Sequence, residues 1–176
     1  MENQSKKINP NLTFEIDTSR KLFNKLLEEY EDFDKNHLSP RFAMNSAVDS
    51  WHLTDWTFQE FYKNDERFQD IEKVNKKGKT KFISGIGIYQ HFLIKKCPEL
   101  EYIRLITNGT KHCILRDSNR KEKTVLKQGD FSSDFCRKDY HVSRFIIEID
   151  KQKELDFEET LLKTIEFWKS FLDSHK

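Results

Sequence analysis

Apolar residues recur at helical spacing through the first two thirds of the chain. In the first segment they lie three and four residues apart, which predicts a helix that ends near Asn36 and is capped by Asp17, Thr18 or Ser19. Its apolar positions are Leu22, Phe23, Leu26, Leu27, Tyr30 and Phe33. This stripe would form the face that the helix buries.

Three more helices are predicted after the first. The second begins at Pro40, behind the N-cap Ser39, and runs to about residue 64. The third covers about residues 80–95 and contains two glycines, Gly85 and Gly87, which destabilise a helix unless a neighbouring backbone approaches closely. The fourth extends from about residue 98 to 112. Between the second and third helices, residues 65–78 are interpreted as a basic loop or a short helix.

The pattern changes after the fourth helix. Residues 112–116 and 123–128 are predicted to form short strands, and residues 143–150 form the clearest strand because they are rich in β-branched and aromatic side chains. Residues 129–141 have no regular pattern. Asp156 is placed to cap a last, amphipathic helix.

These elements predict a mainly α protein of the α+β class. We expect a bundle of about five helices with a small antiparallel β-sheet inserted, at about residues 112–150, before the C-terminal helix. Residues 17–176 would form a single domain behind an N-terminal extension, residues 1–16.

Composition narrows the classes of function. The chain has 176 residues, with 31 basic and 30 acidic residues and a net charge of +1, so no global field draws it to nucleic acid or to an anionic membrane. No segment approaches the roughly 20 apolar residues of a membrane span, and residues 1–16 lack the apolar core of a signal peptide, so we expect a cytoplasmic protein. Three widely spaced cysteines and the absence of nucleotide-binding glycine motifs indicate no metal site and no cofactor.

Two predicted helices carry polar stripes. Asn45, Asp49 and His52 share one edge of the second helix, and Arg104, Asn108 and His112 share one side of the fourth. Polar side chains beside an apolar face are costly unless they have partners, so the two stripes could face each other, with Asp49 paired to Arg104 or orienting a histidine. A histidine could then move a proton to or from a phosphodiester while Arg104 stabilises the phosphate charge.

The same residues also suit purely structural roles. His112 would interact favourably with the dipole at a helix C-terminus, and Arg104 with an acidic neighbour. Asn108-Gly109 is a common end of a helix, and if the helix ended there, Arg104, Asn108 and His112 would not share one side of it. Asp49 and His52 could supply two metal ligands, but the sequence offers no third.

The helical pattern and the late Arg104 and His112 in "RLITNGTKH" resemble the HEPN superfamily. Its signature arginine and histidine usually stand closer together, and a polar residue often occupies the position of Leu105. Active members are metal-independent RNases of toxin–antitoxin, abortive-infection and CRISPR-linked systems, and two protomers usually form the site. From about Asp17 onward, the layout also resembles small bacterial proteins to which no activity is assigned.

The resemblance implies an RNA-cleaving or RNA-binding homodimer in a defence or toxin–antitoxin system, or a partner protein of one. Arg104 and His112 would be catalytic, with help from Asn108, Asp49 or His52. The residues expected to contact RNA are Lys76, Lys77, Lys79 and Lys111. The alternative is a non-enzymatic helical interaction or regulatory subunit whose polar stripes form an internal network. The exposure of Arg104 and His112 distinguishes the catalytic role from the structural one. Catalysis needs both side chains in an open groove, whereas the side chains of a structural network are buried and bound to their partners.

Overall fold

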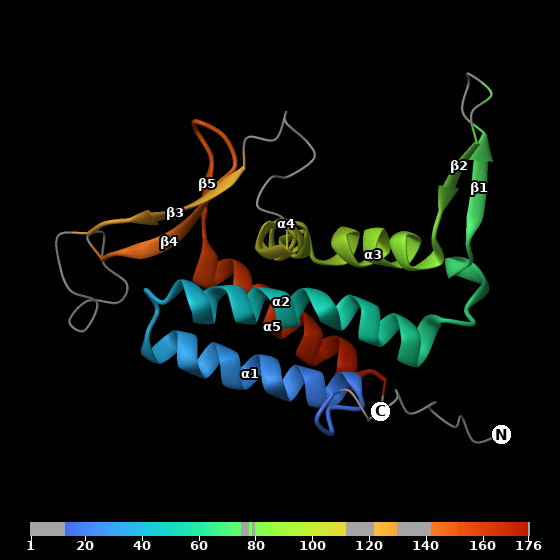
Figure 1. The fold of residues 1–176 in the computed structure, drawn as a ribbon, viewed down its shortest axis with the longest axis horizontal. Coiled ribbons are helices and arrows are strands. Elements are labelled where there is room, and N and C mark those ends of the chain that lie inside the picture. Colours follow the sequence, from blue (N-terminus) through green and yellow to red (C-terminus); the bar gives the residue numbers. More distant parts are fainter. Residues whose placement is uncertain (1–12, 75–77, 79, 112–121, 130–141, 176) are drawn as a thin grey trace.

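A computed structural model describes residues 13–74, 78, 80–111, 122–129 and 142–175 of the chain. These residues form a mainly helical α+β fold, as the sequence predicts, with five α-helices and two small antiparallel sheets (Figure 1). Among the described residues, no helix has the length and apolar character needed to cross a bilayer.

Two long helices form the base of the bundle. α1 (Ser19–Lys35) and α2 (Pro40–Thr57) run antiparallel, and α5 (Phe157–Asp173) lies across them (Figure 1). The predicted caps are confirmed at α1 and α5, where the side chains of Thr18 and Asp156 accept hydrogen bonds from backbone N–H groups. α2 continues into a π-helical segment, Phe58–Tyr62.

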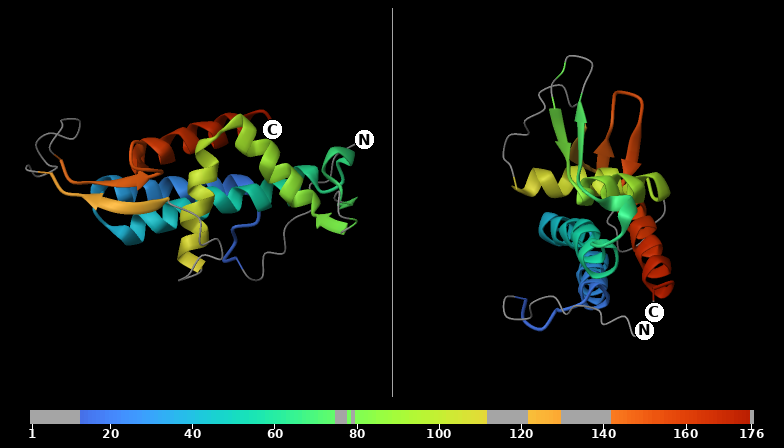
Figure 2. Two further views of the ribbon diagram at one scale, coloured as in Figure 1. Left: turned by 90° about the horizontal axis from the view of Figure 1, so that it is seen from above. Right: turned by 90° about the vertical axis from the view of Figure 1, so that its right-hand side faces the viewer.

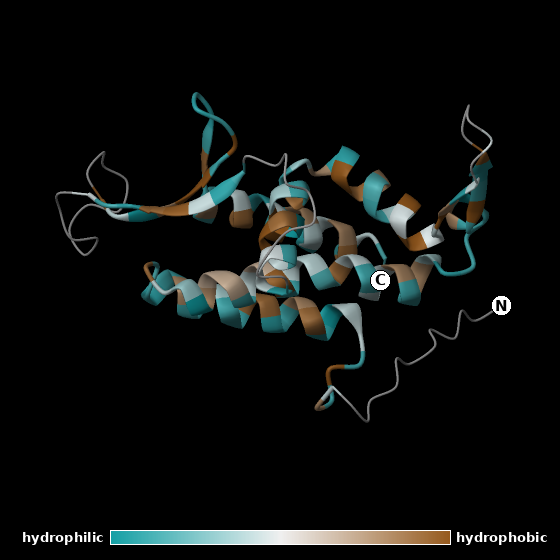
Figure 3. Ribbon diagram, turned by 45° about the horizontal axis from the view of Figure 1, so that its top comes forward, coloured by the Kyte–Doolittle hydropathy of each residue, from teal (hydrophilic) through white to brown (hydrophobic). Residues whose placement is uncertain are grey.

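The remaining helices cover α2 from the other side. α3 (Gly85–Lys96) leads through Cys97 into α4 (Glu99–Lys111), which crosses α2 steeply (Figure 2). The hydroxyl of Thr107 donates a hydrogen bond to the Ala47 carbonyl over 3.1 Å and so fixes the crossing point. Brown apolar and teal polar positions alternate along the helices, as burial of one face requires (Figure 3).

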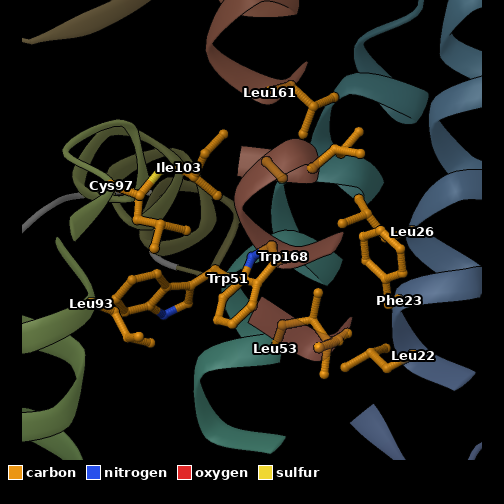
Figure 4. Packing of buried hydrophobic residues seen from close by; sticks show 14 of the residues in the cluster. Leu22, Phe23, Leu26, Trp51, Leu53, Leu93, Cys97, Ile103, Leu161 and Trp168 are labelled. Carbon is orange, nitrogen blue, oxygen red and sulfur yellow. The ribbon is translucent and has the colours of Figure 1, made fainter. Parts of the chain in front are cut away.

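All five helices contribute to one cluster of buried side chains. Trp168 of α5 lies at its centre, near Trp51 and Leu53 of α2 (Figure 4). Its indole N–H donates to the Ser50 carbonyl over 3.0 Å, so the large ring is buried without an unsatisfied donor.

The segment between α2 and α3 agrees with the prediction only in part. A short helix is present as a 3-10 turn, Glu66–Phe68, but it precedes a strand that was not predicted, β1 (Ile71–Val74). The predicted third helix begins later than expected, because residues 80–83 form β2 (Thr80–Ile83), paired antiparallel with β1. The helix starts only where the Ser84 hydroxyl caps the Gly87 amide.

The close approach predicted at the glycines is confirmed at Gly85. A Cβ there would lie 2.0 Å from the Phe68 carbonyl oxygen, and the Gly85 amide donates to Asp70 over 2.7 Å. A side chain at this position would therefore collide with the backbone of the 3-10 turn.

The second sheet lies before α5, where the sequence predicts one. β3 (Lys123–Lys127), β4 (Arg144–Glu148) and β5 (Glu154–Asp156) pair in that order, all antiparallel. β5 was not predicted, and the predicted strand at residues 112–116 lies outside the described residues.

Candidate functional site

Two residues of the polar stripe of α2, Asn45 and Asp49, contact α1. Asp49 accepts a hydrogen bond from the Lys25 ammonium over 2.5 Å, and the same ammonium lies 3.2 Å from a carboxylate oxygen of Glu29. Asn45 donates its side-chain amide to the other Glu29 oxygen over 3.0 Å. We call these four residues, Lys25, Glu29, Asn45 and Asp49, the α1–α2 polar network.

Burial controls the charges in the α1–α2 polar network. Asp49 is 6% exposed, and this burial raises the pKa of its carboxyl, although Lys25 offsets part of the effect. Burial alone would lower the pKa of Lys25, but its hydrogen bonds and charge interactions with Asp49 and Glu29 outweigh it and raise that pKa. The buried negative charge of Asp49 therefore depends on Lys25 to offset the cost of its desolvation.

The pairing of Asp49 with Arg104 that the stripes suggested is wrong. Arg104 instead binds Glu101 within α4: its Nε donates over 2.8 Å and its Nη2 over 2.5 Å to the two carboxylate oxygens. This two-pronged bond raises the pKa of Arg104 and outweighs the opposing effect of burial. One edge of the guanidinium fork that would hold a phosphate is thus already occupied by a carboxylate.

α4 does not end at Asn108-Gly109. It continues to Lys111, so Arg104, Asn108 and Lys111 keep their helical spacing, and the alternative of an early helix end is wrong. His112 lies outside the described residues, as do Lys76, Lys77 and Lys79.

His52 does not join this group. Its side chain is exposed on α2, and it influences the carboxyls of Asp49 and Asp55 only through charge. Gln90 of α3 donates to the exposed carboxylate of Asp55 over 3.3 Å. The structure thus ties the second half of α2 to α3, a contact that the sequence did not indicate.

A hollow lies on the other flank of α4. It has a volume of about 400 Å³ and is walled by α4, by Met44 of α2 and by Ile147 and Lys123 of the second sheet. The α4 residues that line it include Tyr102, Ile106 and Gly109. At 100° per residue these positions point away from Arg104 and Asn108, so the candidate catalytic side chains do not line this hollow.

Apolar residues of α4 outside its buried face are a sequence signal for the hollow. Tyr102, Leu105 and Ile106 are apolar positions of α4 beyond the fully buried stripe of Leu100 and Ile103. Apolar residues on more than one side of a helix indicate a second contact surface.

Within the described part of the chain, no three His, Cys, Asp or Glu side chains are grouped to hold a metal ion. Cys97 is buried, and burial together with the neighbouring Glu99 raises the pKa of its thiol to about 11, which keeps it protonated and poorly nucleophilic.

No protein-family model, curated protein sequence or solved structure matches the chain. The interpretation of its polar residues therefore rests on their own geometry.

Proposed function

We propose that this protein is a helical interaction or regulatory protein whose polar stripes stabilise the bundle and perform no reaction. The observation that carries the proposal is the α1–α2 polar network, in which Asp49 is buried and bound to Lys25. A buried polar group with its partners in place is the expected form of a structural network. A general base must instead reach the proton that it removes.

The binding of Arg104 agrees with this proposal. Its Nε and Nη2, one of the two N–H pairs with which an arginine can clamp a phosphate, are engaged by Glu101. The resemblance to the HEPN superfamily then implies the setting, a bacterial defence or toxin–antitoxin system, in which this chain would bind a partner protein.

A metal-independent RNase remains the second candidate, because one observation favours it. α4 is continuous through residues 108–109, so Arg104 and Asn108 share a flank, and the Arg104 side chain is 25% exposed. In that case, an RNA phosphate would displace Glu101 from Arg104 and His112 would move the proton.

One assay separates the two candidates. Wild type, Arg104→Ala and Arg41→Ala would each be purified by size-exclusion chromatography. Every fraction of the protein peak would then be incubated with end-labelled total RNA in EDTA and assayed for RNA fragments. Arg41 is a matched control, since it is an exposed arginine that stacks on its neighbour Phe42. We expect all three proteins to leave the RNA intact.

The opposite pattern would overturn the proposal. Cleavage that co-elutes with wild type and Arg41→Ala, and is lost in a folded Arg104→Ala variant, would establish an RNase that uses Arg104.

A further inference from the structure

The hairpin of β1 and β2 stands clear of the helical bundle (Figures 1 and 2). Its eight strand residues are exposed except Ile83, which is half-buried. Val74 is 69% exposed and Phe82 is 61% exposed, which are high values for large apolar side chains. A two-stranded ribbon on its own is marginally stable in water, so these strands gain most from a partner.

The two faces of the hairpin differ in chemistry. Residues opposite each other in an antiparallel pair point to the same side, and the sides alternate along each strand. Val74 and Phe82 therefore share one face with Thr80 and Glu72, whereas Lys73 and Lys81 lie directly opposite each other on the other face, which also carries Ile71 and Ile83. We call these the apolar face and the basic face of the hairpin, after the exposed Val74 and Phe82 on the first and the lysine pair on the second.

The basic face lacks compensation within the described part of the chain. Neither Lys73 nor Lys81 forms an ion pair with another described residue, and two like charges directly opposite each other destabilise a strand pair. An acidic group beside them would remove this repulsion. Charge thus specifies an acidic partner on this face.

The hairpin also has open edges. Its sheet contains only two strands among the described residues, so the outer backbone groups of each strand are available to a further strand. The edge of β2 suits an acidic strand better, because β2 carries Lys81 and Phe82 but no acidic residue, whereas β1 contains Glu72.

We propose that β2 binds an extended segment of a partner protein by strand addition, and that this segment alternates acidic with apolar residues. Its acidic side chains would lie beside Lys81 on the basic face, and its apolar side chains beside Phe82 on the apolar face. This inference rests on the proposed interaction role and names the surface that performs it.

The side chains of the hairpin disfavour two other occupants of the β2 edge, a second copy of the chain and a nucleic acid. A second copy paired through the same edge would bring two Lys81 side chains into one basic face. A nucleic acid would be held mainly by phosphate contacts, which leave Val74 and Phe82 of the apolar face exposed.

The test uses the full chain and a fluorescein-labelled, capped synthetic peptide in which glutamate and valine alternate over eight residues. Binding would be measured by fluorescence anisotropy, and its location by amide chemical shifts. We expect the shifts to change at residues 80–83, and Lys81→Glu to weaken binding by at least about tenfold. Lys169→Glu, an exposed lysine of α5, is the matched control and should bind as wild type does.

Two further peptides test wild type alone, so the result does not depend on a variant that folds. A peptide N-methylated at every residue has no backbone N–H to donate and cannot pair with a strand edge, and a peptide with lysine in place of glutamate has the wrong charge; neither should bind. The proposal is overturned if the glutamate peptide does not bind or if either control peptide binds equally well. It is also overturned if single-stranded RNA, or a second copy of the chain, occupies β2 instead.

The two proposals can fail separately. If the glutamate peptide does not bind but the RNA stays intact, strand addition fails and the interaction role stands. RNA cleavage that requires Arg104 would overturn the interaction role, whatever the peptide does.

Discussion

Single residues explain how α2 can be both rich in polar side chains and buried. Each of its buried polar side chains has a hydrogen-bond partner. The donors and acceptors are Phe42 for Ser46, Lys25 for Asp49, Thr164 for Ser50, Gln90 for Thr54, and Leu53 and Tyr89 for Thr57. Several of these bonds cross to another helix, so they determine which helices are neighbours as well as satisfying buried atoms.

The sequence predicted that the edge of Asp49 needs a partner, because an unpaired buried carboxylate is costly. It did not identify Lys25 as that partner. The choice between α1 and α4 depends on how the helices are rotated about their axes, and this is set by packing of the whole core.

Cys97 should make stability fall at high pH. The pKa of its thiol is raised from 9.0 to about 11 in the folded protein, so the unfolded chain loses this proton first. The stabilisation is complete below pH 9 and is lost as the pH rises to 11. It amounts to about 2–3 kcal/mol at 1.36 kcal/mol per pKa unit.

Urea unfolding of wild type and Cys97→Ala at pH 8, 9, 10 and 11 would measure this effect. Between pH 8 and pH 11, the free energy of unfolding should fall by about 2–3 kcal/mol less in Cys97→Ala than in wild type. Parallel curves for the two proteins would contradict the assignment.

The helices were predictable where they bury a face. α1, α2, α4 and α5 have buried positions at helical spacing, and each was predicted close to its observed bounds. β3 and β4 were also predicted close to their bounds, from their β-branched and aromatic residues, although β3 has no fully buried side chain. β1 and β2 were missed. They are four residues long and lie outside the core, so neither shows an alternation between buried and exposed positions.

Gly85 and Gly109 make a matched pair of tests within helices. Gly85→Ala should destabilise the protein by about 1–3 kcal/mol, because the new Cβ would meet the Phe68 carbonyl at 2.0 Å. Gly109→Ala should stabilise it by about 0.5–1 kcal/mol, since no atom lies within 4 Å of its Cβ position and alanine favours the interior of α4.

Thermal unfolding of the two variants would measure both effects. Destabilisation by Gly109→Ala would mean that α4 is not helical there, whereas a neutral Gly85→Ala would mean that the 3-10 turn does not press against α3.

At the scale of the whole molecule, the bundle and the hairpin have different roles. The bundle buries the polar side chains of α2 that have partners within α2 or on α1, α3 and α5. The hairpin presents apolar and basic side chains outside it. The proposed function depends on Asp49 being a structural residue that joins α1 to α2.

A double-mutant cycle on Lys25 and Asp49 tests this structural role, with urea unfolding as the measurement. Lys25→Met should cost about 2–3 kcal/mol, because it leaves the Asp49 carboxylate buried without its partner. Adding Asp49→Asn should recover part of this loss, giving a coupling of at least about 1 kcal/mol. The exposed pair Lys127 and Glu154, 2.7 Å apart, is the control and should couple by less than about 0.5 kcal/mol. Additive effects at Lys25 and Asp49 would contradict the account and return Asp49 to the list of candidates for chemistry.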